Sequence, residues 1–141
     1  MKDVSLETAR NLMLSENHTC VLCKNEVLFT SDERGVKPLL KWLESDTDLS
    51  GFSASDKVVG KAAAFLYVLL GVKEVYALVM SEPAREVLIK NGIKTEFETL
   101  VPAIRNRIDT GFCPMETAVL GLDDPGNAYL AVKAKIKDLT K

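Results

Sequence analysis

Residues 105–118, with the sequence RNRIDTGFCPMETA, contain the first group of side chains that could do chemistry. Proline favours the first position of a helix, so this spacing predicts a helix entrance with Cys113 as the N-cap and Glu116 at the third helical position. Free amides and the helix dipole at such an entrance stabilise a thiolate, which makes Cys113 a candidate nucleophile. The alternative is a capping box in which an inert thiol replaces the usual hydroxyl.

The residues just before Cys113 suit a binding loop. Thr110 and Gly111 favour a tight turn whose amides could hold an oxyanion or a phosphate. Three charged residues lie nearby in sequence, namely Arg105, Arg107 and Asp109. They either line the opening of the same site, with Arg107 as a ligand contact, or are ordinary surface charges.

Residues 53–70, SASDKVVGKAAAFLYVLL, form the second group, and their apolar run predicts one long buried helix capped by Ser53. A helical projection of that segment puts five residues on one charged, small-residue face, namely Asp56, Lys57, Gly60, Lys61 and Ala64. One interpretation is a cleft wall with Asp56 and Lys61 as acid/base or anion-binding groups and Lys57 as a further ligand contact. The other is a solvated stripe in which Gly60 permits close packing.

The remaining cysteines and the single histidine do not form a metal or triad motif. Cys20 and Cys23 lie three residues apart on an expected strand, so their side chains point to opposite faces and packing is expected. His18 is too isolated in sequence for a triad or a multi-histidine site. No metal and no cofactor are predicted.

Hydrophobic periodicity, helix caps and turn residues predict the helices and strands that must position these residues. Helices are expected over 4–16, with Ser5 as the N-cap, and over 36–44, 53–70, 81–91, 113–120 and 125–139. Strands are expected over 18–24 and 26–31, joined by a tight hairpin at Lys24-Asn25, and over 73–80 and 95–101. The segments between 73 and 101 predict a parallel β-α-β unit.

Length and composition narrow the class of protein. With 141 residues and 47% hydrophobic residues, residues 1–141 are expected to form one domain. A net charge of −2 offers no basic stripe for nucleic acid, and no apolar run reaches the roughly 18 residues of a membrane span. The N-terminus has no signal-peptide core, and the odd cysteine count suits reduced thiols, so a cytoplasmic location is expected.

Two motifs resemble those of the cytidine and tRNA-adenosine deaminases. The C-P-M-E of residues 113–116 looks like their P-C-x-x-C zinc motif, and V-G-K at 59–61 looks like their H-A-E. More closely, the text GKAAA, VYALVMSEPA and NRIDTGFCPMETAV is similar to the family called domain of unknown function 1893, over most of the chain.

The resemblance implies an α/β fold, a three-layer α-β-α sandwich with a mixed sheet of the cytidine-deaminase-like kind. It also implies that the zinc site is lost, because Val59, Lys61 and Glu116 stand where a ligand, the proton-transfer glutamate and another ligand would be. The two core helices would meet at one pocket. Deaminase-like folds often oligomerise, so a homodimer is a further expectation.

Three functional hypotheses follow. The first is a module that binds a small polar ligand, with a nucleotide as one option, in a pocket formed by Lys61 and Cys113. The second is a metal-independent enzyme with Cys113 as nucleophile and Lys61 as its charge partner. The third is a scaffold or oligomer subunit, and the sequence does not rank substrates for any of them.

Overall fold

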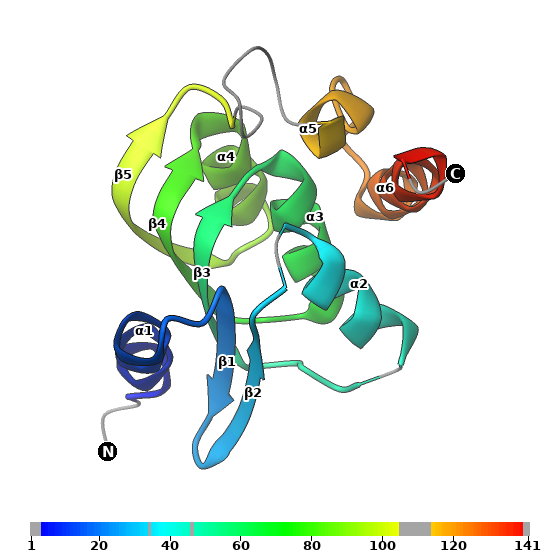
Figure 1. The fold of residues 1–141 in the computed structure, drawn as a ribbon. Coiled ribbons are helices and arrows are strands. Elements are labelled where there is room, and N and C mark those ends of the chain that lie inside the picture. Colours follow the sequence, from blue (N-terminus) through cyan, green and yellow to red (C-terminus); the bar gives the residue numbers. More distant parts are fainter. Residues whose placement is uncertain (1–3, 34, 46, 105–113, 140–141) are drawn as a thin grey trace.

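The computed structural model describes residues 4–33, 35–45, 47–104 and 114–139, and Figure 1 shows their arrangement. The strands are β1 (Cys20–Lys24), β2 (Val27–Ser31), β3 (Ser53–Val59), β4 (Glu74–Ser81) and β5 (Lys94–Val101). The helices are α1 (Ser5–Glu16), α2 (Lys37–Glu44), α3 (Lys61–Leu70), α4 (Glu82–Lys90), α5 (Pro114–Ala118) and α6 (Pro125–Leu139).

The described strands form one mixed five-stranded sheet in the order β2-β1-β3-β4-β5. β1 is antiparallel to both β2 and β3, whereas β3, β4 and β5 run parallel to one another. The parallel β4-α4-β5 unit is therefore confirmed. Ser81 caps α4 as its hydroxyl accepts the amide of Ala84, and Gly92 follows the helix with φ 76°.

Helices cover both faces of the sheet (Figure 1). α1 packs on one face against a small cluster that includes Val21, Cys23 and Tyr76. The other face carries α2, α3 and α4, with α6 packed against the outer side of α3. An α/β fold with a mixed sheet between helices is thus confirmed.

The amino-terminal hairpin agrees with the sequence except at its helix cap. Asn25 adopts φ 55° in the turn between β1 and β2, a conformation that asparagine tolerates. The expected N-cap, Ser5, is wrong: Val4 occupies that position, and the Ser5 hydroxyl instead accepts the amide of Asn25. The serine therefore ties α1 to the hairpin.

The largest correction concerns residues 53–70, which are not one helix. Residues Ser53–Val59 form β3, the central strand, Gly60 is the N-cap, and only Lys61–Leu70 are helical. The predicted charged face of a single helix therefore does not exist. Asp56 and Lys57 are consecutive strand residues, whereas Lys61 begins the helix.

Burial of residues Ser53–Asp56 explains why hydrophobic periodicity did not identify β3 as a strand. A fully buried central strand has no alternation of polar and apolar residues, so its pattern resembles that of a buried helix. The polar side chains of β3 find partners that only the folded chain supplies: Ser53 donates to Glu74 at 2.6 Å, and Ser55 donates to the Met13 sulfur at 3.3 Å. Those contacts lie far apart in sequence, where local patterns carry no information.

α3 is the buried helix at the centre of the larger core. Residues 62–67 are all buried, and the helix contacts α2, α4 and α6. A helix that is apolar on every side suits this position. Among the described residues, no helix has the length and apolar character needed to cross a membrane.

The alanines of α3 set how closely its neighbours approach. Ala64 is fully buried, so Ala64→Leu should destabilise the fold by roughly 1–3 kcal/mol through overpacking. Ala134→Leu, on the exposed face of α6, is the matched control and should change stability by less than about 0.5 kcal/mol. Urea unfolding of both variants measures the difference, and equal costs would show that α3 has room to spare.

Candidate functional site

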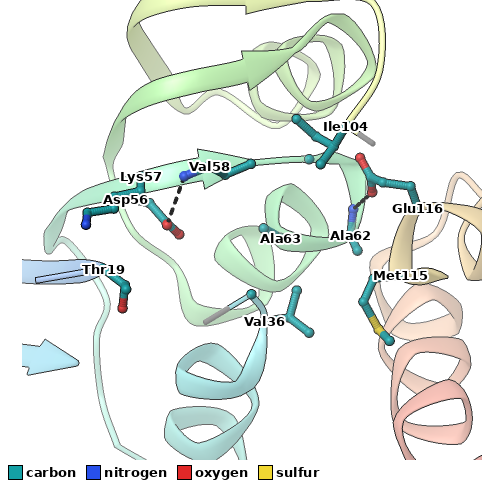
Figure 2. A pocket seen from close by; sticks show the side chains of 12 residues that line it. Thr19, Val36, Asp56, Lys57, Val58, Ala62, Ala63, Ile104, Met115 and Glu116 are labelled. Carbon is teal, nitrogen blue, oxygen red and sulfur yellow. Dashed lines mark hydrogen bonds between the residues drawn. The ribbon is translucent and has the colours of Figure 1, made fainter. Parts of the chain in front are cut away.

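A pocket of about 400 Å³ opens where β3 ends and α3 begins (Figure 2). It lies at the carboxyl end of a parallel strand, the usual place for ligands in open α/β sheets. Residues from the start of β1, the start of α2, the segment after β5 and α5 complete its wall. The described lining residues are Thr19, Gly35, Val36, Asp56, Lys57, Val58, Gly60, Ala62, Ala63, Ile104, Met115 and Glu116.

The Glu116 carboxylate joins α5 to the beginning of α3. Its Oε1 accepts the amide of Lys61 at 2.7 Å, and its Oε2 accepts the amide of Ala62 at 2.9 Å. The first amides of a helix have no partner within the helix and lie at the positive end of its dipole, so a carboxylate is well suited to them. Sequence reasoning placed Glu116 at its own helix entrance, but in the structure it caps a different helix.

Burial raises the pKa of Glu116 above its ordinary value. The amides of Ala62 and Lys61 and the charge of Lys61 act in the opposite direction without cancelling the effect. The carboxylate is therefore held by hydrogen bonds in a place that opposes its charge.

Gly60 is needed for this contact because of space and not because of backbone conformation. Its φ of −98° is open to other residues, but a Cβ there would lie 2.1 Å from Glu116 Oε1. The glycine thus lets the carboxylate reach the helix start.

The second carboxyl of the pocket, Asp56, is almost completely buried, with 6% of its surface exposed. Tyr67 donates its hydroxyl to Asp56 Oδ2 at 2.7 Å, and the amide of Val58 lies 3.4 Å from Oδ1. The Tyr67 oxygen also lies 3.2 Å from Cys20 Sγ. Since the phenol has one proton and gives it to Asp56, the Cys20 thiol is the donor to Tyr67 when Asp56 is ionised.

Desolvation by burial raises the pKa of Asp56 to about 7, against the lowering effect of the Tyr67 hydroxyl and the amides of Val58 and Lys57. Burial also raises the pKa values of the Cys20 thiol and the Tyr67 phenol well above their ordinary range. Asp56 is therefore the member of this network that titrates near neutral pH. A pocket-lining carboxyl of that kind is a candidate for function.

The structure brings together some of the predicted site residues and separates others. Asp56, Lys57, Gly60 and Glu116 line the pocket, although Lys57 extends its ammonium group to Asn17 Oδ1 at 2.7 Å. Lys61 is not among the described lining residues.

The Lys61 ammonium group lies 5.7 Å from the centre of the Phe65 ring. The Lys61 amide binds Glu116, and the Lys61 charge acts on the pKa of that carboxyl. Arg105, Arg107, Asp109, Thr110, Gly111 and Cys113 lie outside the described residues.

Sequence reasoning missed Tyr67 and Thr19 and assigned Cys20 to packing. Cys20 and Cys23 do point to opposite faces, into the two separate apolar clusters. His18 pairs with Asp32 at 2.7 Å, outside the pocket lining. The one available signal for Tyr67 was a hydroxyl within an otherwise apolar helix, which must find a partner when buried. Among the described residues, no three His, Cys, Asp or Glu side chains are grouped to hold a metal ion.

The steric role of Gly60 can be isolated with a double-mutant cycle. Gly60→Ala should cost roughly 1–3 kcal/mol, because the added methyl group forces Glu116 away from the α3 amides. In a Glu116→Ala background the same change should cost much less, since the clash is gone. Denaturant unfolding of the four proteins measures the coupling, and an equal cost in both backgrounds would contradict it.

The raised pKa of Asp56 predicts a specific pH dependence of stability. The folded carboxyl keeps its proton up to about pH 7, whereas the unfolded one, with an ordinary pKa of 3.8, loses it earlier. Its contribution is therefore fully present below the unfolded pKa and is lost as pH rises from about 4 to 7, at up to about 1.4 kcal/mol per pH unit. Relative to Asp56→Asn, the wild type should lose stability across this window in urea titrations. Parallel curves for the two proteins would rule out the shift.

Comparison with known proteins assigns the family but not an activity. Residues 8–136 match the family model described as Domain of unknown function (DUF1893). The fold is similar to the crystal structure of a DUF1893 family protein from Thermotoga maritima, with 25% identity and a TM-score of 0.87. That alignment covers 96% of this chain and 92% of the other. No curated protein matches this sequence. Because the family model spans most of its length, this chain belongs to the DUF1893 family.

Proposed function

We propose that this chain is a ligand-binding domain that holds a small polar molecule in the pocket between β3, α3 and α5. The observation that carries this proposal is a buried carboxyl, Asp56, facing a pocket whose other walls are mostly apolar. Ligand sites combine apolar walls with a few placed polar groups in this way, and about 400 Å³ suits a small molecule.

The proposed fold type is that of the cytidine deaminases, with the zinc site replaced by a protein carboxylate. The contact between Glu116 of α5 and the start of α3 supports it, because the two motifs that resemble the deaminase motifs meet there. The residues at the corresponding positions do not fit zinc. Val59 is a buried aliphatic residue without a ligand atom, and Glu116 is held at the start of α3 by two backbone amides. One carboxylate is left where a zinc site needs three or four His, Cys or carboxylate ligands, and the described residues contain no group of three such side chains.

A catalytic role for Asp56 is a second candidate. Its carboxyl has a pKa of about 7 and lines the pocket, so at neutral pH it is able both to accept and to release a proton. The alternative nucleophile, Cys113, lies outside the described residues, and the Lys61 ammonium group is directed to Phe65. Acid/base chemistry by Asp56 is therefore the catalytic role that the described residues support.

A ligand panel tests binding at this pocket. Nucleobases, nucleosides, nucleotides, amines and carboxylic acids are screened by thermal denaturation, since a ligand at about 100 times its Kd stabilises the native state by about 2.7 kcal/mol. Val58→Trp should block the pocket and abolish the shift, because Val58 lines it and is 45% exposed.

Val27→Trp, at a similarly exposed strand position outside the pocket lining, is the matched control and should retain the shift. Binding should persist in the presence of a metal chelator. A panel without any stabilising compound, or a shift that survives Val58→Trp, contradicts the proposal. Product analysis of the binding compounds with wild type and Asp56→Asn then separates turnover from binding alone.

A further inference from the structure

The charged groups of the pocket are unbalanced. Its described lining contains the carboxyls of Asp56 and Glu116 and a single cationic side chain, Lys57. The Lys57 ammonium group donates to Asn17 Oδ1 at 2.7 Å. Among the described residues, neither carboxyl forms an ion pair with a lysine, an arginine or a histidine. The part of the lining that the structure describes therefore presents negative charge without an ion-paired protein cation.

The polar groups of the described lining offer hydrogen-bond acceptors to a ligand, whereas several of its donors are already used within the protein. Three lining amides are already used within the protein: Lys57 donates to the Thr19 carbonyl, Val58 to Asp56 and Ala62 to Glu116. The Thr19 hydroxyl donates its proton to the carbonyls of Ser31 and Glu33, at 2.8 and 2.6 Å. That hydroxyl can therefore only accept from a ligand.

Both carboxyls retain acceptor capacity. An ionised carboxylate has about four lone-pair positions. Asp56 accepts the Tyr67 hydroxyl and the long contact from Val58, and Glu116 accepts one amide on each oxygen. A ligand that satisfies the remaining positions must bring hydrogen-bond donors, and a cationic N–H group would also balance the negative charge of the described lining.

The two carboxyl groups lie apart in the pocket. Figure 2 shows Asp56 and Glu116 at opposite ends, with Ala62 and Ala63 between them. Larger apolar side chains complete the walls, namely Val36, Val58, Ile104 and Met115. The space between the two acceptors thus suits an apolar body, either flat or aliphatic.

We infer that the pocket takes a small organic cation whose N–H groups bind Asp56, an amine or an amidinium with an apolar body, and that it rejects phosphates and carboxylates. This inference rests on the proposed function and specifies its ligand class. A buried carboxylate without a cation is costly, and a bound cation removes that cost by direct pairing. Burial disfavours the charged form of both pocket carboxyls in the ligand-free protein, and this effect raises their pKa values.

Three probes of nearly equal size test the sign of the charge: benzamidine, benzamide and benzoate, titrated into the protein at about pH 8 with detection by NMR. Benzamidine should bind at least about tenfold more tightly than benzamide, as expected for a hydrogen bond to a charged group, and benzoate should not compete. Asp56→Asn should remove the preference for benzamidine over benzamide. Asp123→Asn, at an exposed position outside the pocket lining, is the control and should bind as wild type does.

A pH series on the wild type makes the test independent of whether a variant folds. Benzamidine keeps its charge while Asp56 gains a proton, so its affinity should fall as pH decreases from about 8 to 5.5. The other groups that face Asp56 are Tyr67 of α3 and Cys20 of β1, which stay protonated over this range. The pKa of Glu116, across the pocket, is raised in the same direction, and Lys57 is the one cationic side chain of the described lining.

The outcomes separate the inference from the proposed function. Equal binding of benzamidine and benzamide, tighter binding of benzoate, or no binding of benzamidine overturns the cation preference. If benzamide, benzoate or a panel compound then binds and Val58→Trp abolishes that binding, the pocket is still a ligand site. If no compound binds in a Val58→Trp-sensitive way, both fail.

Discussion

The contact between the Glu116 carboxylate and the first amides of α3 connects the parts of this structure that form the pocket. α3 is the buried helix against which α2, α4 and α6 pack, so its starting point fixes the position of most of the larger core. The contact of Glu116 with the α3 amides needs a glycine at position 60 and a short turn from β3 into α3. It also needs α5, which comes from a distant part of the sequence, to lie beside the start of α3. Removing any of these would free the helix start and open one wall of the pocket.

A carboxylate at this place changes what the pocket can do. It satisfies the helix amides from within the protein, so those amides are not available to an anionic ligand. The pocket is left with acceptors, since Asp56, Glu116 and the Thr19 hydroxyl all present lone pairs. Internal capping of α3 thus connects the fold to the kind of ligand that we propose for the site.

The Cys20–Tyr67–Asp56 chain shows why part of the candidate site was predictable and part was not. Asp56, Lys57 and Glu116 were selected from sequence because charged residues beside apolar runs and helix starts are unusual, and all three line the pocket. The arrangement assigned to them was wrong, as Asp56 lies on a strand and Lys61 is directed to Phe65. The sequence signals that Tyr67 needs a buried partner but does not identify that partner, and it gives no signal for Cys20, because both contacts depend on β1 and α3 meeting beside β3.

Elements whose signals are local could be predicted from the sequence, namely the hairpin at Lys24-Asn25, helix α4, the parallel β4-α4-β5 unit and helix α6. Periods, caps and turns arise from neighbouring residues, so they can be read along the chain. Contacts between distant parts of the chain make residues 53–59 the central strand, place Glu116 at the start of α3 and bring Tyr67 to Asp56. The physical reason is that residues Ser53–Asp56 of β3 are buried on both faces and that Ser53 and Ser55 bind residues distant in sequence. Strand and helix therefore differ here in long-range contacts and not in local pattern.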